Sequence, residues 1–536
     1  MAVLLAISPV IVILLLMTWA RRPADVAGAI GWAYTALIAA LYFHTDWRVI
    51  LIASLAGMVA SFPISLMVVT SIFQINVMEE AGAIRRLVAF MKTLASDNRA
   101  VQIMLINVGA GTLLAALGAT PVSILPPIML ALGYSAFISI ALPAVGYDSL
   151  CTYALLGVPV VVFADVVSKV SGQAYTPAEV GAFFAQYMPV ITSLIALAML
   201  WLAGGWAGVR RGWLVALLTG LTAGFIAIGM NAAGLPTLTG VAAGLGVVLA
   251  MLVYLKVRGK RVIDRTQLKG ADIAAEKSMG LARAALPWIL LVLFSILTNY
   301  GALGLYDVLF TKLAMPLTIV PGKPEKLRVL WQAYTWVLIA TLVAVPFYRM
   351  RAEGIRAALR KTGRRVPRPA FAAAVYFAVA YVLNNSGMAT TALAPGGWVL
   401  AANGVNMVKA VANACAAGLH GAYAGAAAFL GLLGGFVSGS ETSSIVMLTK
   451  LHFDTVAQVF SSADPEHVRL AALLVAAVSG IGGGLASVIS PAKLQNAAAV
   501  IDCIGMEGKV IRSTVVIALI LTAAAALLTF VFLARL

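Results

Sequence analysis

The sequence predicts an all-α polytopic membrane protein. Of its 536 residues, 62% are hydrophobic and only 11% are charged, whereas a soluble domain carries about 25% charged residues. Apolar runs of about 20 residues recur along the chain, which is the length that a helix needs to cross a bilayer, and the strand alternation of an outer-membrane barrel is absent. We expect about 12 transmembrane helices plus two re-entrant hairpins in inverted repeats, with broken helices at the midplane.

The charge distribution indicates a membrane partner and no nucleic acid. The net charge is +17, but the lysines and arginines lie in short loops, as the positive-inside rule expects. Three cysteines lie far apart in apolar segments with no metal or redox spacing, so neither a metal nor a cofactor is expected. Residues 1–20 are apolar and Arg21-Arg22 follow them, which predicts a first span with its N-terminus outside the cell, in the plasma membrane.

Hydropathy and charge divide the chain into five predicted parts. They are N-terminal spans and an interfacial helix (1–62), a first repeat (63–165) with re-entrant hairpin 101–132, middle spans (166–369), an inverted second repeat (370–512) with re-entrant hairpin 421–450, and a C-terminal span (513–536). The middle part contains two basic loops, 256–283 and 349–368. Two predicted spans lie between these loops, so both loops are on the same side of the membrane. Both loops are therefore predicted to face the cytoplasm.

Glycine-rich, hydroxyl-rich stretches interrupt the apolar segments near both ends of the chain. The predicted hairpin tips are Gly118–Ser123 and Gly439–Ser444, and each tip precedes a span with a proline break, at Gly157–Pro159 and at Ile489–Pro491. The second of these spans is also predicted to break at Gly480–Gly484. The topology gives the two units opposite orientations, which is typical of secondary transporters that bind solute at the midplane. No nucleotide-binding P-loop is present, so an ion or solute gradient must drive transport.

Several motifs resemble those of one family. Gly434–Ser444 resembles the signature GxxLTGSDTSSN of the L-lactate permease family, and Val488–Pro491 resembles its M-I-S-P element. Asn384–Gly387 resembles its S-N-Y-S-G, and Asp97–Gln102 resembles its D-Q-R-x-Q-M. The likeness covers most of 63–165 and 370–535. It implies proton-coupled symport of L-lactate or a related 2-hydroxy monocarboxylate such as glycolate. It also implies a homodimer, with 166–369 as scaffold and dimerisation region, and an elevator-like movement of the hairpins.

The charged positions depart from the family pattern. Where the family's first hairpin reads E-G-A-A-G-F-G-A-P, this chain has Leu113–Pro121, so Leu113 replaces the acid. The family's N-T-A before the first broken span is Tyr147-Asp148-Ser149. The lysine that usually precedes M-I-S-P is Ser487, and Lys493 stands after the proline instead. Relative to the family pattern, this chain therefore lacks one acidic residue and has another at Asp148, and its lysine stands after the proline and not before it.

The candidate site residues follow from what a buried anion requires. A monocarboxylate in a low-dielectric cavity needs a cation or several hydrogen-bond donors in place of water. Lys493 is the predicted cation, with a structural salt bridge to Asp148 or Glu441 as its alternative role. Glu441 and Asp148 are the predicted proton-coupling groups, because burial disfavours the charged form of a carboxyl group. The predicted donors, for which helix packing is the alternative, are Gly118, Thr120, Ser123, Asn384, Asn385, Ser386, Ser440, Thr442, Ser443, Ser444 and Ser490.

Other functions remain open at this point. A carrier of the same architecture for a dicarboxylate or another organic anion, perhaps coupled to sodium, fits the same observations. A channel is a further alternative, although no filter sequence of the potassium-channel type and no arginine-rich voltage sensor occurs. An enzyme is not expected, because no nucleophile–base pair or metal spacing stands out.

Overall fold

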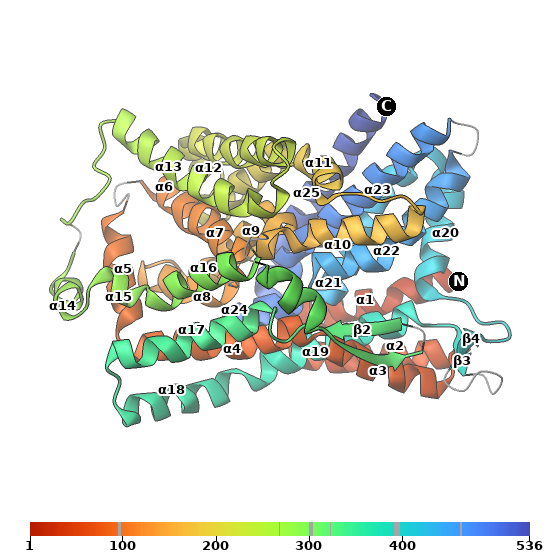
Figure 1. Cartoon of the computed structure of the whole chain (residues 1–536), viewed down its shortest axis with the longest axis horizontal. Coiled ribbons are helices and arrows are strands. Elements are labelled where there is room, and N and C mark those ends of the chain that lie inside the picture. Colours follow the sequence, from red (N-terminus) through yellow and green to blue (C-terminus); the bar gives the residue numbers. More distant parts are fainter. Residues whose placement is uncertain are drawn as a thin grey trace.

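The computed structural model of the chain is a bundle of packed helices with two small β-hairpins (Figure 1). It describes residues 1–94, 98–118, 120–266, 268–299, 304–321, 323–390, 397–460 and 464–536. Two positions named above, Asp97 and Ala119, lie outside these residues.

The N-terminal part of the described chain is helical throughout. Its elements are α1 (Ala2–Thr18), α2 (Ala24–Leu41), α3 (Trp47–Ala60), α4 (Phe62–Glu80), α5 (Ala83–Thr93), α6 (Arg99–Ile103), the π-helical η1 (Met104–Ala110), α7 (Gly111–Ala116), α8 (Pro121–Ala131), α9 (Ala136–Tyr147), the 3-10 turn η2 (Asp148–Tyr153) and α10 (Ala154–Ser171). The helix α3, predicted to lie at the membrane surface, packs along α19 and α2.

The middle part adds helices and one unexpected β-hairpin. Its elements are α11 (Pro177–Ala185), α12 (Met188–Ala232, kinked at Gly204 and Gly205), η3 (Pro236–Leu238), α13 (Thr239–Val257), α14 (Gly270–Ser278), α15 (Leu281–Ala284), α16 (Leu286–Asn299), the π-helical η5 (Asp307–Lys312), β1 (Met315–Val320), β2 (Lys323–Leu327), α17 (Ala333–Tyr348) and α18 (Ala352–Arg365). The strands β1 and β2 pair antiparallel.

The C-terminal part consists of helices and a second small β-hairpin. Its elements are α19 (Pro367–Asn384), the paired strands β3 (Met388–Thr390) and β4 (Trp398–Leu400), α20 (Met407–Leu419), η6 (His420–Ala422), α21 (Tyr423–Ser438), α22 (Glu441–Val459), α23 (Pro465–Leu485), the 3-10 turn η7 (Ala486–Ile489), α24 (Pro491–Ala499) and α25 (Glu507–Leu533).

Eight helical stretches among the described residues are long and apolar enough to cross a membrane, and a bent pair, α18 with α19, brings the number to nine. Further apolar helices, such as α1, α16, α17 and α21, are shorter than 18 residues. A multi-pass helical membrane protein is therefore confirmed, while the number of about 12 spans stays a prediction.

The two hairpins pack in a reciprocal way. The second arm of the first hairpin, α8, packs against α9 and against α24, which follows the break of the second repeat. The second arm of the other hairpin, α22, packs against α23 and against α10, which follows the break of the first repeat. Each hairpin therefore contacts the broken span of its own unit and the broken span of the other unit.

The predicted helix break at Gly480–Gly484 is wrong. The helix α23 continues through these glycines to Leu485, and the chain departs from α-helix only at η7 and Ser490. The glycines instead allow close packing: a Cβ on Gly482 would lie 2.0 Å from the Ala428 carbonyl oxygen of α21. Small residues at a helix crossing are a common packing surface in membranes, and here that role prevails over helix breaking.

We expect Gly431→Ala to disrupt this crossing. A Cβ there would lie 1.8 Å from the backbone oxygen of Ser479, which cannot rotate away. The clash should destabilise the fold by about 2 kcal/mol or more, seen as a lower apparent melting temperature of the purified protein in detergent. Gly363→Ala in α18 is the matched control, since a Cβ there meets nothing within 4 Å. Equal melting temperatures for the two variants would contradict the packing argument.

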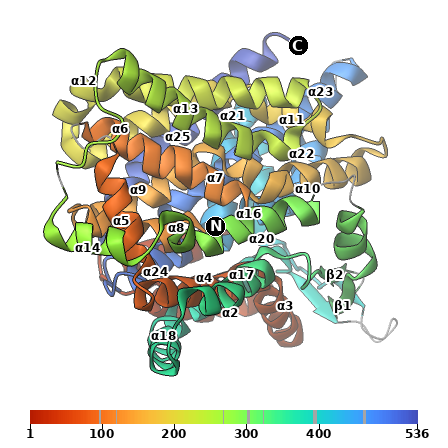
Figure 2. The same ribbon diagram turned by 60° about the vertical axis from the view of Figure 1, so that its left-hand side comes forward.

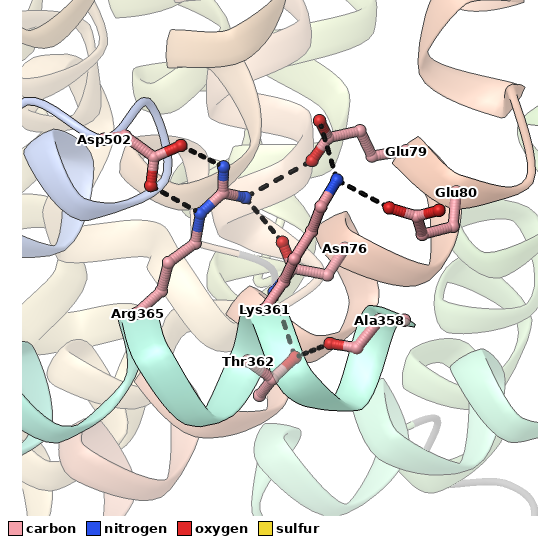
Figure 3. Close-up of polar contacts among 8 residues, drawn as sticks. All are labelled: Asn76, Glu79, Glu80, Ala358, Lys361, Thr362, Arg365 and Asp502. Carbon is pink, nitrogen blue, oxygen red and sulfur yellow. Dashed lines mark hydrogen bonds and ion pairs between the residues drawn. The ribbon is translucent and has the colours of Figure 1, made fainter. Parts of the chain in front are cut away.

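A polar cluster ties α18 to α4 and to the loop after α24, and Figure 3 shows it. Arg365 donates from Nη1 to Asn76 Oδ1 at 2.6 Å and to Glu79 Oε2 at 3.3 Å. Its Nε donates to Asp502 Oδ1 at 2.9 Å. The Lys361 ammonium lies 2.6 Å from Glu80 and 3.4 Å from Glu79. Figure 2 shows α4, α17 and α18 on the same side of the molecule, where α4 packs against both of the others.

We expect Arg365→Gln to loosen this connection without removing the fold. The side chains of Glu79 and Asp502 are 43% and 68% exposed, so water screens these pairs and the loss should be only about 1 kcal/mol. A thermal unfolding curve in detergent measures it. Lys312→Gln, which removes an ion pair to Asp307 between two exposed side chains, should change the curve less. An unfolding curve for Arg365→Gln that matches the wild-type curve would show that this cluster does not stabilise the packing of α18 against α4.

Candidate functional site

The second hairpin has the broken tip that its sequence predicts. The helix α21 ends at Ser438, Gly439 adopts a left-handed backbone with φ of +66°, and α22 starts at Glu441. The Ser440 hydroxyl accepts a hydrogen bond from the Ser443 N–H at 3.3 Å and so caps α22. A helix N-terminus of this kind presents backbone N–H groups and the positive end of the helix dipole.

The first hairpin has a matching tip. The helix α7 ends at Ala116, Gly118 has a φ of +87°, and α8 starts at Pro121. The Leu117 carbonyl accepts a hydrogen bond from the Ser295 hydroxyl of α16 at 2.6 Å. A Cβ on Gly118 would lie 2.7 Å from the Cβ of Ala333. The helices α16 and α17 of the middle part therefore contact this tip directly.

The two tips line one cavity of about 260 Å³. The residues that it takes from the tips and from the broken spans are Gly118, Thr120, Tyr147, Cys151, Leu155, Gly439, Ser440, Glu441, Thr442, Ser443, Lys493 and Asn496. Apolar side chains such as Met67 and Phe377 complete its walls. The structure thus brings together residues more than 300 positions apart at the place where the helices are interrupted.

Glu441 is buried in this site, with only 3% of the residue exposed. The Thr152 hydroxyl donates to Glu441 Oε1 at 2.6 Å, while Oε2 has no hydrogen-bond partner among the described residues. A Cβ on Gly484 would lie 2.6 Å from that second oxygen, so the absence of a side chain at Gly484 leaves room for the carboxyl group.

Asp148 connects the two broken spans. It lies at the start of η2, in the break of the first repeat, and its Oδ2 accepts a hydrogen bond at 3.3 Å from the N–H of Val488 in η7. Its Oδ1 has no hydrogen-bond partner among the described residues. Asp148 does not line the cavity itself, but the neighbouring Tyr147 and Cys151 do.

Lys493 supplies a cation to the cavity. Its ammonium donates to the Ser487 hydroxyl at 2.5 Å and lies 4.2 Å from the centre of the Tyr147 ring. No carboxylate of the described residues lies within the 4.0 Å of an ion pair with Lys493, so the alternative role as a structural salt bridge has no direct contact in this conformation. An aromatic face and one hydroxyl are the direct contacts of Lys493, and its charge also acts at longer range on the carboxyl groups of Asp148 and Glu441.

Three of the predicted serines, Ser123, Ser490 and Ser444, do not line the cavity. Ser123 is fully buried and accepts a hydrogen bond from the Asn496 amide at 2.7 Å. The Ser490 hydroxyl has no partner among the described residues and would lie 3.1 Å from a Cβ on Gly439. Ser444 donates to the Gly431 carbonyl at 3.2 Å, so it serves the packing of α21 against α22.

The three predicted polar residues at the end of α19, Asn384, Asn385 and Ser386, make different contacts in the structure. Asn384 lines a second cavity of about 190 Å³, together with Thr442 and Ser443 of the second tip. Asn385 donates to the Tyr381 carbonyl at 2.9 Å. The Ser386 hydroxyl accepts from the Met407 N–H at 2.7 Å and so caps α20. Neither Asn385 nor Ser386 lines the main cavity, and both instead make backbone contacts.

Sequence reasoning missed several cavity residues. Asn496 stands one helical turn after Lys493 on α24, a spacing that would have placed it on the same face. Thr152, which does not line the cavity, was also missed, although its hydroxyl donates to Glu441. Arg328 and Gln332 come from the chain between β2 and α17, and hydropathy gave no signal for them. No cluster of three or more metal-ligating side chains occurs among the described residues.

These features are typical of a multi-pass membrane transporter, because carriers bind solutes where helices are interrupted inside the bundle around a cavity with a few polar groups. The L-lactate permease family model matches residues 2–536, so the chain belongs to the L-lactate permease family. It is therefore a permease and not an enzyme.

Named relatives agree with this assignment. The chain is 24% identical to a glycolate permease of Escherichia coli (strain K12), over 99% of this chain and 95% of that protein. It is 25% identical to an L-lactate permease of Streptococcus iniae, over 84% of this chain and 89% of that protein. An L-lactate permease of Bacillus subtilis (strain 168) is 23% identical over 99% and 95% of the two chains. No solved structure matches the chain.

Proposed function

We propose that this protein carries L-lactate, glycolate or a related 2-hydroxy monocarboxylate across the plasma membrane together with protons. The observation that supports this most is the shared cavity, which Lys493 lines together with residues of both helix tips. A single carboxylate would take its charge partner from Lys493 and hydrogen bonds from Ser440, Thr442 and Ser443. The substrate's 2-hydroxyl would find a partner in the Asn496 amide oxygen, which has none among the described residues.

Glu441 is the proposed proton carrier, with Asp148 as second group. Both are buried, and each has one carboxyl oxygen without a partner among the described residues. Glu441 and Lys493 line the same cavity, so an anion that binds Lys493 changes the field at Glu441. Uptake of a proton by Glu441 would keep the loaded cavity close to neutral, which lowers the cost of moving it through the membrane.

The proposed transport cycle moves the hairpins relative to the middle spans, in an elevator-like manner and within a homodimer. The reciprocal packing of α8 on α24 and of α22 on α10 supports two inverted repeats as its basis. The amino terminus lies at the opposite end of the bundle from α5, α14 and α18 (Figure 1), which carry basic residues. This arrangement supports an N-terminus outside the cell and basic loops in the cytoplasm.

Uptake of radiolabelled L-lactate into proteoliposomes tests the proposal. We expect accumulation when the lumen is alkaline relative to the outside, its loss when an ionophore collapses the pH gradient, and competition by glycolate. Accumulation that follows a sodium gradient and ignores pH would replace proton coupling by sodium coupling. No gradient-dependent uptake of any monocarboxylate would refute the proposal.

A further inference from the structure

The main cavity contains a second cation, which the sequence motifs do not include. Arg328 lines the cavity together with Trp331 and Gln332, and it follows directly after β2. Unlike Lys493, which stands on a broken helix of the second repeat, Arg328 comes from the middle part of the chain. Arg328 is half-buried. It therefore lies where the cavity meets the surface of the protein.

Aromatic and backbone contacts fix the position of this arginine. Its guanidinium carbon lies 3.9 Å from the centre of the Phe310 ring, and its Nε donates to the Phe310 carbonyl at 3.0 Å. Phe310 packs edge-on against Trp331, with ring centres 4.8 Å apart. The Arg328 carbonyl accepts from the N–H groups of Trp331 and Gln332, at 3.0 and 2.9 Å. The side chain is therefore held flat against one wall.

This geometry suits a carboxylate. The Nε bond to Phe310 uses one of the five donors of a guanidinium, whose remaining edge has the spacing of two carboxylate oxygens. Among the described residues, Tyr306 and the exposed Asp165 of α10 are the acidic groups that act electrostatically on Arg328. A charge in such a position is partly screened by water and is suited to exchanging its partner.

We propose that Arg328 is an anion-capture residue: it binds the carboxylate of the incoming acid at the mouth of the cavity and passes it to Lys493. This inference rests on the proposed function and adds a first binding station to it. The two cations belong to different parts of the chain, the middle part and the second repeat. Movement of the hairpins against the middle spans would therefore change the distance between the stations and release the anion from Arg328.

The test compares Arg328→Gln and Arg328→Lys with wild type in proteoliposomes. We expect Arg328→Gln to raise KM for lactate uptake by about ten- to hundredfold, with little change in maximal rate, and Arg328→Lys to recover most of the loss. Wild-type uptake at low lactate should fall as salt rises, because salt screens a half-buried cation, and uptake by Arg328→Gln should respond less. A purely structural role would lower the maximal rate and leave the salt response unchanged.

Arg48→Gln is the matched control. Arg48 also lies over an aromatic ring, 5.6 Å from the centre of Trp47, but it does not line the cavity. The Arg48→Gln variant should have the KM and the salt response of wild type.

If wild type transports lactate and Arg328→Gln has the same KM, the inference about Arg328 fails and the proposed function stands. If wild type neither transports nor is thermally stabilised by lactate, glycolate or succinate, both fail. Wild type could also prefer succinate to lactate, with that preference lost in Arg328→Gln. Such a result would mean that Arg328 and Lys493 bind the two carboxylates of one dicarboxylate, and it would overturn the proposal that the anion binds first to Arg328 and then to Lys493.

Discussion

Replacing Lys493 by alanine should weaken lactate binding at every pH. The ammonium is held by the Ser487 hydroxyl and the Tyr147 ring, and no carboxylate of the described residues forms an ion pair with it, so its charge is available to a bound anion. A hydrogen bond to a charged group contributes about 1.5–3 kcal/mol, which corresponds to roughly ten- to hundredfold in affinity. Titration calorimetry of the detergent-solubilised protein measures this, since it separates binding from transport.

Lys450→Ala provides the comparison for this result. Lys450 forms an ion pair with Asp454 on α22, at a side-chain exposure of 72%, and it lies outside the cavity. Its removal should leave lactate affinity within a factor of about two of wild type. An unchanged affinity in Lys493→Ala as well would assign Lys493 to the structure of α24 and remove it from the binding site.

Glu441→Gln should abolish accumulation against a gradient while sparing binding. Glutamine has the same shape and can still accept the hydrogen bond that Thr152 donates at 2.6 Å, so the tip should keep its structure. It cannot take up or release a proton, and the driving force of a pH gradient would be lost. Exchange of labelled for unlabelled lactate, which needs no net proton movement, should continue at a rate within about tenfold of wild type.

Glu466→Gln is the control for this variant, because Glu466 pairs with Arg469 at the solvent-exposed start of α23. The Glu466→Gln variant should accumulate lactate to the same level as wild type. Normal pH-driven accumulation in Glu441→Gln would exclude Glu441 as the proton carrier and direct attention to Asp148. Loss of both exchange and binding would instead indicate that Glu441 holds the tip together.

The sequence predicted the hairpin tips well because their signal is local. Gly118 and Gly439 occupy left-handed backbone positions that favour glycine, and Thr120 and Ser440 follow them within two positions in the sequence. The same rule failed at Gly482, where glycine permits close helix contact instead of a break. A glycine in an apolar run has two physical uses, and only the neighbouring helix decides between them.

The rest of the site depends on contacts between distant parts of the chain. Thr152 and Glu441 are 289 positions apart, and nothing in either segment specifies that they meet. Arg328 stands between a β-hairpin and a helix, in a region where the sequence contains no motif that indicates a binding site. Ser386 has the residue type of a ligand contact, yet its hydroxyl caps α20.

A structure determined with L-lactate bound tests the central claim most directly. We predict that the carboxylate lies in the cavity between the tip at Gly439–Ser443 and Lys493, with the ammonium within hydrogen-bonding distance and Glu441 facing the ligand. A saturating ligand found outside this cavity, or a bound state in which the tips at Gly118 and Gly439 no longer share a cavity, would contradict the account.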